Sequence, residues 1–456
     1  MHEAGHIDSW PPGPTGSPIF GSIRDLRADL LGWLERCAAS YGDFVPIRLG
    51  LRQGFLVCDL DVIADVLVRR QGDFRKVHLL SDNRLFLGRG LLTSEGESWC
   101  RQRRRLQPMF HADRVSTYAE IIVDETSRVA ECWRDGRIRD MQDEMARLTL
   151  TILLRCFFGA DAKLCEEDVR RIGNTINIAQ QRMKERSASL VHLPDTVWTP
   201  RNIRLRRAIH IMDEIIYRMI AARRKHGANT PDLLSTLMAA SDTDGKRMSD
   251  REVRDEAVTM LFAGHETTGL TLSWAWFLLS QHPAEAARIR AEIAMIAGSS
   301  PLNAAHVPHL RVVGQVVKEV QRLYPPVYAY GREAVVDVIV GRYRLPAGAS
   351  VIIAPWVLHR QSRFFPDPLR FRPERWTDDF EPRLPHFAYC PFGGGPRQCI
   401  GKGLAMLESV LILAMLARNY DPQLCSSRAI ELWPAFTLRS RYGLPMAVNR
   451  LQPVRE

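Results

Sequence analysis

The sequence lacks the features of a secreted, disulfide-stabilised or membrane-spanning protein. Its 456 residues contain nine cysteines, an odd number, and no two of them form a CxxC pair. A disulfide framework and a structural zinc site are therefore not expected. The first twenty residues hold no apolar core of signal-peptide length, and no later run approaches the roughly 20 apolar residues that cross a bilayer. We expect a cytoplasmic protein without a transmembrane anchor.

The sequence also has little that indicates a nucleic-acid partner. The net charge is +10, but the basic residues are widely spread. Neither zinc-finger spacing nor an RNA-binding signature is present. The charge also suits an anionic membrane or an acidic protein partner. Hydrophobic residues make up 46% and charged residues 25% of the chain, so a globular protein with a substantial core is expected.

The chain has no internal repeat, low-complexity stretch or linker, so we predict a single domain over residues 1–456. Residues 43–50 and 54–60 predict two short strands around a turn at residues 52–54, after an extended proline-rich arm. Most of residues 61–295 show apolar side chains at helical spacing.

The last quarter of the chain changes character. After Tyr324, short β-branched runs alternate with Gly and Pro, which predicts small hairpins. A last long helix is expected to follow Gly401, over residues 403–420. The predicted fold is therefore mainly α with a minor β part.

One predicted helix is unusually long. Ser249 and Glu252 form a capping box, and the helical pattern runs to about Gln281, where Pro283 would stop it. A helix over residues 249–281 would be roughly 50 Å long, enough to cross a whole domain.

The middle of this helix is locally weak. Gly264 costs about 1 kcal/mol relative to alanine, and Thr267 and Thr268 can bond back to carbonyls one turn earlier. Glu266 adds a carboxylate at the same place. Two interpretations remain open at this point: a functional groove, or a helix crossing with a small residue at the contact.

The loop PFGGGPRQCIG, residues 391–401, leads into the last helix. Phosphate would be the usual ligand of such a loop, but neither a GK[ST] nor a GxGxxG motif is present. A cysteine at the start of a helix favours the thiolate form, which is a good ligand for iron. Gly401 would let the backbone approach a large flat group, and Arg397 supplies a cation. The loop therefore predicts an iron-containing cofactor with anionic groups, and the alternative is a buried free cysteine.

These residues resemble the cytochrome P-450 family of haem-thiolate monooxygenases, of the soluble bacterial type. The loop has the full pattern of the family's cysteine-ligand loop, with Phe392, Gly393, Gly395, Arg397, Cys399 and Gly401 in place. The other matching stretches, in chain order, are Trp99-x-x-x-Arg103, Ala263-Gly264-x-Glu266-Thr267-Thr268, Glu319-x-x-Arg322 and Phe371-x-Pro373-x-Arg375. The resemblance covers nearly the whole chain.

The resemblance implies haem b as cofactor, with Cys399 as the axial ligand of the iron, and O₂ as co-substrate. Glu266 and Thr267 would organise proton delivery to the bound oxygen. The residues implied to hold the cofactor are Trp99, Arg103, Arg332, Phe392, Arg397 and Gly401. For Arg103 the alternative is an ordinary surface arginine.

Glu319, Arg322 and Arg375 resemble a buried charge network that serves folding and cofactor retention. An exposed i,i+3 ion pair is the alternative for Glu319 and Arg322. Cys390 lacks the loop context and is interpreted as structural.

Electrons must come from other proteins, because the chain contains neither a flavin module nor a group of cysteines spaced for an iron–sulfur centre. The expected partners are a ferredoxin or flavodoxin with its reductase, fed by NAD(P)H, and the chain itself is expected to be a monomer. The basic run 101–105, with Lys402, would suit an acidic partner of this kind. A solvated charged helix face is the alternative.

The sequence says less about the substrate than about the cofactor. An apolar pocket is expected from the side chains that the family pattern places near the substrate: Phe86, Leu87, Phe262, Ala263, Val327, Tyr328 and Ala329. A core role remains the alternative for Phe86. The motif at residues 262–269 favours a fatty acid or a terpenoid that becomes hydroxylated. A peroxide-using or rearranging haem-thiolate enzyme and a non-catalytic haem sensor are the other function classes.

Overall fold

The computed structural model describes residues 10–50, 52–77, 83–159, 165–188, 197–226, 232–241, 245, 247–426 and 428–451. The chain divides into two compact units. The first comprises Met1–Leu80 and Gln321–Cys399, and the second comprises Ser81–Val320 and Ile400–Glu456. Each unit thus combines segments that are distant in sequence, and the single-domain prediction stays a prediction.

The first unit is built on a five-stranded sheet with the order β1-β2-β8-β5-β3. Its strands are β1 (Phe44–Leu49), β2 (Arg52–Val57), β3 (Phe74–Lys76), β5 (Tyr330–Ala334) and β8 (Ser350–Ile353). β2 pairs with β1 in antiparallel and with β8 in parallel register, so the N-terminal strands join a segment about 300 residues later. β1 and β2 confirm the two predicted strands. The predicted turn at residues 52–54 is wrong, because β2 already begins at Arg52 and Gly50 adopts a positive φ of 65° before it.

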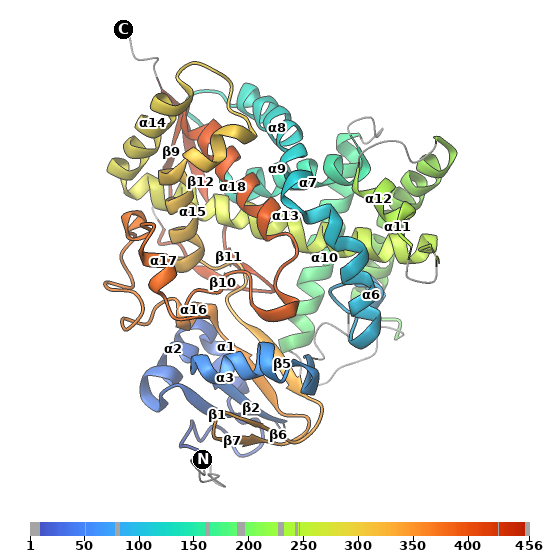
Figure 1. The fold of residues 1–456 in the computed structure, drawn as a ribbon, viewed down its shortest axis with the longest axis vertical. Coiled ribbons are helices and arrows are strands. Elements are labelled where there is room, and N and C mark those ends of the chain that lie inside the picture. Colours follow the sequence, from blue (N-terminus) through green and yellow to red (C-terminus); the bar gives the residue numbers. More distant parts are fainter. Residues whose placement is uncertain are drawn as a thin grey trace. The chain divides into compact units, whose positions relative to one another are not determined.

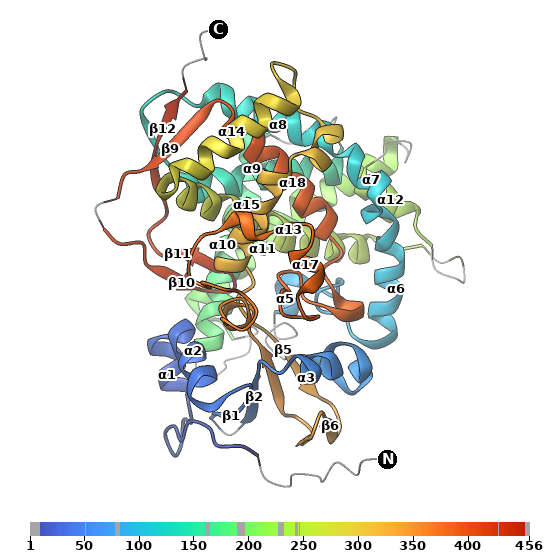
Figure 2. The same ribbon diagram turned by 60° about the vertical axis from the view of Figure 1, so that its left-hand side comes forward.

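Short helices and one hairpin complete this unit. The strands β6 (Val338–Val340) and β7 (Tyr343–Leu345) form the hairpin, which confirms the hairpin character predicted after residue 324. α2 packs beside β1 and β2 (Figure 2). The helices of the unit are α1 (Ile23–Ala28), α2 (Leu30–Tyr41), α3 (Leu60–Ala64), η1 (Asp65–Arg69), η2 (Gln71–Asp73), α16 (Pro355–Leu358), η5 (Pro373–Arg375), α17 (Phe380–Arg383) and η6 (Gly395–Arg397).

The second unit is mainly helical. Its helices are α5 (Arg84–Leu87), α6 (Gly96–Leu106), η3 (Gln107–Phe110), α7 (Ala112–Thr117), α8 (Ala119–Cys132), α9 (Met141–Phe158), α10 (Glu166–Ala188), α11 (Pro200–His226), α12 (Leu233–Ala239), α13 (Asp250–Gln281), α14 (Pro283–Ala297), η4 (Ala304–His309) and α18 (Lys402–Ala417). α15 (Arg311–Leu323) begins in this unit and ends in the first. Figure 1 shows α13 running through the middle of the second unit, where it packs against α9 and α18.

α13 follows the sequence prediction closely. The Ser249 side chain accepts a hydrogen bond from the Glu252 N–H, and the Glu252 carboxylate accepts one from the Ser249 N–H, so the capping box is confirmed. The helix ends at Gln281, immediately before His282 and Pro283. Its residues are buried on nearly all sides, as expected for the central helix of a domain.

The last helix is shorter than predicted. α18 ends at Ala417, and Tyr420 already begins β9 (Tyr420–Leu424). β9 pairs with β12 (Pro445–Arg450), and Figure 2 shows these two strands side by side near the C-terminus. β12 also pairs with β4 (Arg137–Asp140). A second small sheet consists of β10 (Leu432–Pro434) and β11 (Leu438–Ser440). The fold is mainly α with a minor β part, as predicted. Across the part of the chain that the structure describes, each helix is either too short or too polar to cross a bilayer.

Candidate functional site

The cysteine loop is held by its own backbone. The Gly393 N–H donates to the Cys390 carbonyl at 3.0 Å, and the Cys399 N–H donates to the Phe392 carbonyl at 3.0 Å. Gly393 and Gly395 both have φ of +67°, a conformation that favours glycine. The Cys399 side chain lies on the exposed side of this loop.

The glycines are also required by close packing within the first unit. A Cβ on Gly395 would lie 2.1 Å from the Leu67 carbonyl oxygen of η1, and a Cβ on Gly394 would lie 2.2 Å from the Phe387 ring. The loop can therefore approach its neighbours only without side chains at these positions. Its shape fixes where Cys399 emerges.

Cys390 has the opposite environment. It is buried, and its burial raises the pKa of the thiol to about 12, so it remains protonated. Its N–H donates to His359 Nε2 at 3.0 Å. Burial lowers the pKa of His359 to about 3, so this imidazole is neutral and accepts the bond. The environment of Cys390 agrees with a structural role.

Two arginines clamp the segment that precedes the loop. Arg322 is fully buried and donates to the carbonyls of His359 at 2.9 Å and Pro368 at 2.6 Å. Arg375 is also buried and donates to the Pro366 carbonyl at 2.8 Å. These bonds tie residues from α15 and η5 to one stretch of irregular backbone.

Glu319 lies one turn before Arg322 on α15 and is fully buried. Burial of both side chains argues against the alternative of an exposed surface pair. The arginines bind main-chain carbonyls, so their contribution here is to hold a loop rather than to react.

The middle of α13 has features of both structures that the sequence allowed, a helix crossing and an accessible groove. A Cβ on Gly264 would lie 2.9 Å from Leu153 of α9, so Gly264 does lie at a helix crossing. The Thr267 hydroxyl donates to the Ala263 carbonyl at 3.0 Å, and Thr268 donates to the Gly264 carbonyl at 3.3 Å. Ala263 is exposed and Thr267 half-buried, so the side of α13 away from α9 remains accessible.

Glu266 is turned away from Thr267 and has its own partners. Its side chain is 3% exposed, and it forms an ion pair with Arg439 of β11. It also accepts a hydrogen bond from the Gln180 amide of α10, and Arg439 donates to the oxygen of that amide. The carboxylate is thus held in a three-residue network that joins α10, α13 and β11.

A second carboxyl group lies behind the same part of α13. Glu408 of α18 is buried and interacts with the hydroxyl of Thr268. Burial raises the pKa of Glu408 to about 8, with the Thr268 hydrogen bond opposing this shift, so the group is largely neutral at pH 7.

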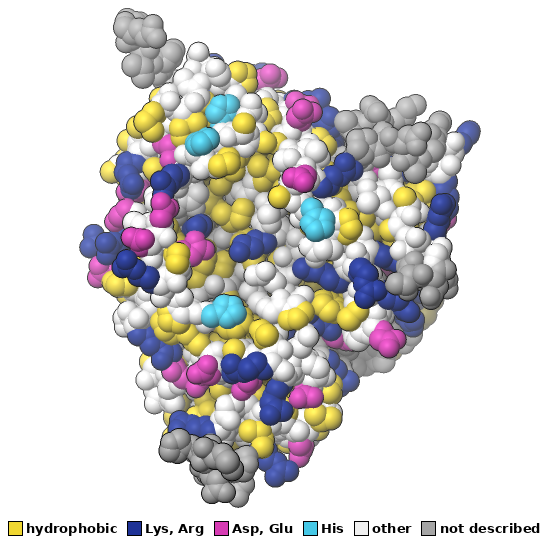
Figure 3. Space-filling view, viewed as in Figure 1, with side chains coloured by type: hydrophobic (Ala, Val, Ile, Leu, Met, Phe, Trp, Pro, Cys, Tyr) yellow, Lys and Arg dark blue, Asp and Glu magenta, His cyan; other side chains and the backbone are white. Residues whose placement is uncertain are grey.

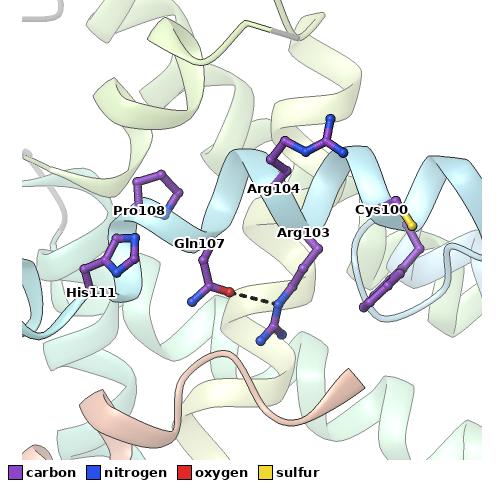
Figure 4. A pocket seen from close by; sticks show the side chains of 7 residues that line it. Cys100, Arg103, Arg104, Gln107, Pro108 and His111 are labelled. Carbon is purple, nitrogen blue, oxygen red and sulfur yellow. Dashed lines mark hydrogen bonds between the residues drawn. The ribbon is translucent and has the colours of Figure 1, made fainter. Parts of the chain in front are cut away.

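Trp99 and Arg103 lie one turn apart on α6 and line one hollow of about 400 Å³. Arg103 Nε donates to Gln107 Oε1 at 3.0 Å, which orients the guanidinium group, whereas Arg104 leaves the helix in another direction (Figure 4). The hollow is lined by Trp99, Cys100, Arg103, Arg104, Gln107, Pro108 and His111.

The remaining predicted cofactor residues lie on separate elements. Arg332 belongs to β5, donates to the Gly331 carbonyl at 2.9 Å and lies over the Tyr330 ring. Arg397 ends η6, two residues before Cys399, and is half-buried. Phe392 opens the loop, and Gly401 is the N-cap of α18.

The predicted pocket residues of the second unit form an aromatic group. Phe86 and Leu87 of α5 are buried, and the Phe86 ring meets Phe262 edge-on with centroids 5.6 Å apart. Phe436, just before β11, adds a third ring 5.0 Å from Phe262. Burial supports the alternative core role for Phe86 as much as a pocket role, since a wall residue can serve both.

Val327, Tyr328 and Ala329 lie together in the first unit, between α15 and β5. All three are half-buried, and the Tyr328 carbonyl accepts a hydrogen bond from the Trp356 N–H at 3.1 Å. Burial raises the pKa of Tyr328, so its phenol stays protonated.

Sequence reasoning did not single out Gln180, Glu408, Phe436 and Arg439. Glu408 had a signal, because it is the single charged residue in the apolar stretch 404–417. No sequence signal indicated Arg439, because its partner Glu266 lies 173 positions earlier in the chain.

Basic side chains are exposed on α6 and at the start of α18. Arg101, Arg104 and Lys402 are exposed, and all belong to the second unit. Figure 3 shows Lys and Arg side chains gathered over the region where α6 lies in Figure 1. This surface has the charge that an acidic protein would require.

The residues present fit a haem-thiolate centre. The cysteine loop presents Cys399 outward on a backbone that only glycines allow, whereas Cys390 in the same region is buried and stays a thiol. A cysteine thiolate is an established axial ligand of haem iron. Arg397, two residues before Cys399 in the same unit, offers a cation suited to a carboxylate of the cofactor.

Comparison with known proteins agrees with this geometry. The family described as "Cytochrome P450" matches residues 11–440. Cyclooctatin synthase of Streptomyces melanosporofaciens is 34% identical over 409 residues, which cover 89% of this chain and 88% of that protein. Pentalenene oxygenase of Streptomyces avermitilis is 30% identical over 408 residues, 89% of this chain and 90% of that protein. A solved structure, retinoic acid bound cyanobacterial CYP120A1, superposes with a TM-score of 0.86 at 26% identity and covers 97% of this chain and 99% of its own.

Proposed function

Because this chain belongs to the cytochrome P450 family and is an oxidoreductase that acts with O₂, we propose that it hydroxylates an apolar terpenoid. Electrons would come from a separate ferredoxin or flavodoxin with its reductase, and ultimately from NAD(P)H. The single observation that carries the proposal is the outward presentation of Cys399 on its glycine-dependent loop. Haem bound at Cys399 would supply the oxygen activation, with the thiolate adding electron density to the iron.

The chain's own residues would position the cofactor and hold protons. Arg103, Arg332 and Arg397 would bind the carboxylates of the haem, together with the indole N–H of Trp99. Arg322 and Arg375 would keep the backbone before the cysteine loop in place, since both donate hydrogen bonds to carbonyl groups of that stretch.

Proton delivery is assigned to Glu266 and Thr267. The Thr267 hydroxyl lies on the accessible side of α13, where it would hold a proton at its Oγ1 once it gives up its bond to the Ala263 carbonyl. The Glu266 carboxylate pairs with Arg439 one residue before Thr267, and this network would supply the proton that Thr267 holds.

Two observations support the terpenoid class. The relatives named above are a cyclooctatin synthase and a pentalenene oxygenase, which are terpenoid-oxidising proteins. The side chains predicted to line the substrate pocket are aromatic and aliphatic, and the rings of Phe86, Phe262 and Phe436 pack together. A fatty acid remains the second class to test, because an apolar wall also suits an acyl chain.

An optical titration of the ferric holoprotein tests the proposal. Sesquiterpenes, diterpenes and saturated fatty acids are added separately, and the Soret band is followed. We expect a saturable shift with at least one terpenoid class, followed by hydroxylated product when a surrogate ferredoxin, its reductase, NADPH and O₂ are added. Saturable binding of fatty acids alone would contradict the terpenoid assignment, and ligand binding without any turnover would contradict the monooxygenase assignment.

A further inference from the structure

A second hollow of about 380 Å³ lies on the second unit, where α5, α11 and the first turns of α13 meet. Four of its seven lining residues are arginines, and the full lining is Arg84, Leu85, Gly88, Arg89, Arg206, Arg251 and Asp255. The turn after α5 closes the hollow along α13, because a Cβ on Gly90 would lie 2.2 Å from Thr259 Oγ1 of that helix. A ligand must therefore reach the arginines from the outer surface.

The carboxylates beside these arginines already have other partners. Asp255 Oδ1 accepts a hydrogen bond from Arg254 Nη1 at 3.0 Å, and its Oδ2 accepts one from the Arg89 N–H at 2.8 Å. Asp250, the first residue of α13, forms an ion pair with Arg224 of α11. These two carboxylates therefore do not balance the guanidinium groups that line the hollow.

Three of the lining arginines have guanidinium groups available to a ligand. Arg89 and Arg251 are exposed, and their guanidinium groups form no ion pair with any side chain in the described ranges. Arg84 is also exposed and makes one long hydrogen bond, 3.4 Å, to the Thr93 carbonyl. The positive end of the α13 dipole lies at Arg251 as well. Cations gathered around a concave surface raise the local concentration of anions.

Large apolar side chains are exposed beside the hollow. Trp198, just before α11, is 79% exposed, and its neighbour Val197 is 40% exposed. The Arg206 guanidinium lies over the Trp198 ring, 5.7 Å from the ring centroid, so the indole borders the hollow. Leu85, which lines the hollow itself, is 42% exposed. Tryptophan is usually well buried in globular proteins, and its amphipathic ring is enriched at the headgroup level of bilayers.

We propose that this face of the second unit binds the surface of a bilayer that contains anionic phospholipids. A headgroup phosphate would occupy the arginine hollow, where the paired N–H donors of arginine match its oxygens. Trp198 and Leu85 would enter the interfacial layer beside it. The binding requires neither substrate nor electrons, so the inference goes beyond the proposed function and does not depend on it.

The apolar rim favours a bilayer over an acidic protein as the partner. Either partner would supply negative charge to the arginines, and each basic side chain near an anionic membrane strengthens binding. A bilayer also has an apolar layer directly below its charges, which would remove Trp198 and Leu85 from water. The charge and the exposed side chains are then explained by one partner.

Co-sedimentation of the full-length holoprotein with lipid vesicles tests the proposal. One set of vesicles mixes phosphatidylglycerol with phosphatidylcholine, and the other contains phosphatidylcholine alone. We expect the protein to partition onto the mixed vesicles and much less onto the neutral ones, with binding that weakens as salt is added. Equal partition onto both kinds of vesicle, or onto neither, would overturn the inference.

Variants assign the binding to the hollow and its rim. Arg89→Gln/Arg251→Gln should lower the partition coefficient on mixed vesicles about thirtyfold, since each basic residue near an anionic surface contributes about fivefold. Arg134→Gln/Arg137→Gln removes the same charge from exposed arginines that do not line the hollow, and it should bind nearly as the wild type does. Trp198→Ala should also bind more weakly, and its remaining binding should be more sensitive to salt.

Equal losses in the two arginine pairs would show that the overall charge of the protein, and not this face, attracts the vesicles. Unchanged binding of Trp198→Ala would contradict the interfacial role of the indole. Immobilised polyglutamate provides the acidic-protein alternative. Retention of the holoprotein on it, lost in Arg89→Gln/Arg251→Gln and without any vesicle binding, would assign the face to an acidic protein and overturn the inference.

Discussion

Glu266 of α13 and Arg439 of β11 form a buried ion pair, although 173 positions separate them in the sequence. Gln180 of α10 bonds to both members of the pair. A residue assigned to proton delivery is therefore restrained from two other elements of its own unit. Motion of either element would change where the carboxylate points.

Arg439→Gln should destabilise the protein by about 3 kcal/mol, because it leaves the Glu266 carboxylate buried without its cation. Guanidinium unfolding of the holoprotein measures this loss. Arg441→Gln is the matched control on the same chain segment, since Arg441 pairs with Glu431 at the surface and about half of each side chain is exposed. That change should cost less than about 1 kcal/mol.

A double-mutant cycle then separates the pair from its surroundings. If the pair is the cause, adding Glu266→Gln to Arg439→Gln costs much less than the sum of the two single changes. Simple additivity of the two losses would show that Arg439 acts through other contacts.

Thr267→Ala should uncouple electron use from product formation. The variant loses the one hydroxyl that lies on the accessible side of this turn of α13, so more NADPH is consumed per product and hydrogen peroxide is released. Thr271→Ala is the control, because Thr271 makes the same type of bond, to the Thr267 carbonyl at 3.0 Å, one turn later. Tight coupling in Thr267→Ala, or equal uncoupling in both variants, would refute the assigned role.

Glu408→Gln should change how stability depends on pH. The pKa of Glu408 rises from 4.5 to about 8 on folding, so the folded protein keeps a proton that the unfolded chain releases. The free energy of unfolding of the wild type therefore falls as pH rises through the window from 4.5 to 8. The variant lacks this term and should gain relative to the wild type by up to about 1.4 kcal/mol per pH unit within the window.

Urea unfolding of both proteins at several pH values measures this gain. Glu120→Gln, an exposed change on α8, should track the wild type at every pH. A pH-independent difference between Glu408→Gln and the wild type would show that the carboxyl group is not neutral in the folded protein.

Electron transfer from an acidic partner should depend on α6. Arg101→Glu/Arg104→Glu reverses two exposed charges, so the reduction rate by a surrogate ferredoxin should fall about tenfold or more at low salt and less at high salt. Lys225→Glu, an exposed change on α11, is the control. Equal rates in both variants would place the docking surface elsewhere.

The elements that the sequence predicted well are those determined locally. Both ends of α13 follow from a capping box and a proline that act within one turn. The end of α18 was missed, because Asn419 and Tyr420 continue an acceptable helical pattern until β9 pairs with the distant β12. The parallel pairing of β2 with β8 and the Glu266–Arg439 pair depend likewise on tertiary contacts that no local pattern encodes.

The candidate site likewise contains features set by local sequence and features set by tertiary contacts. Cys399 and its glycines were predictable because the loop geometry demands particular residues at particular positions. The aromatic contact of Phe262 with Phe436 was not, because any of the chain's other phenylalanines could have supplied that ring.

The most direct test of the central claim is the spectrum of the reduced, CO-treated protein in two cysteine variants. Cys390→Ala should retain the long-wavelength Soret band of thiolate-ligated haem, since that thiol is buried and protonated. Cys399→His should bind haem and show the shorter-wavelength band of a histidine ligand instead. A thiolate band that persists in Cys399→His, or disappears in a folded, haem-containing Cys390→Ala, would contradict the assignment of Cys399 as the axial ligand.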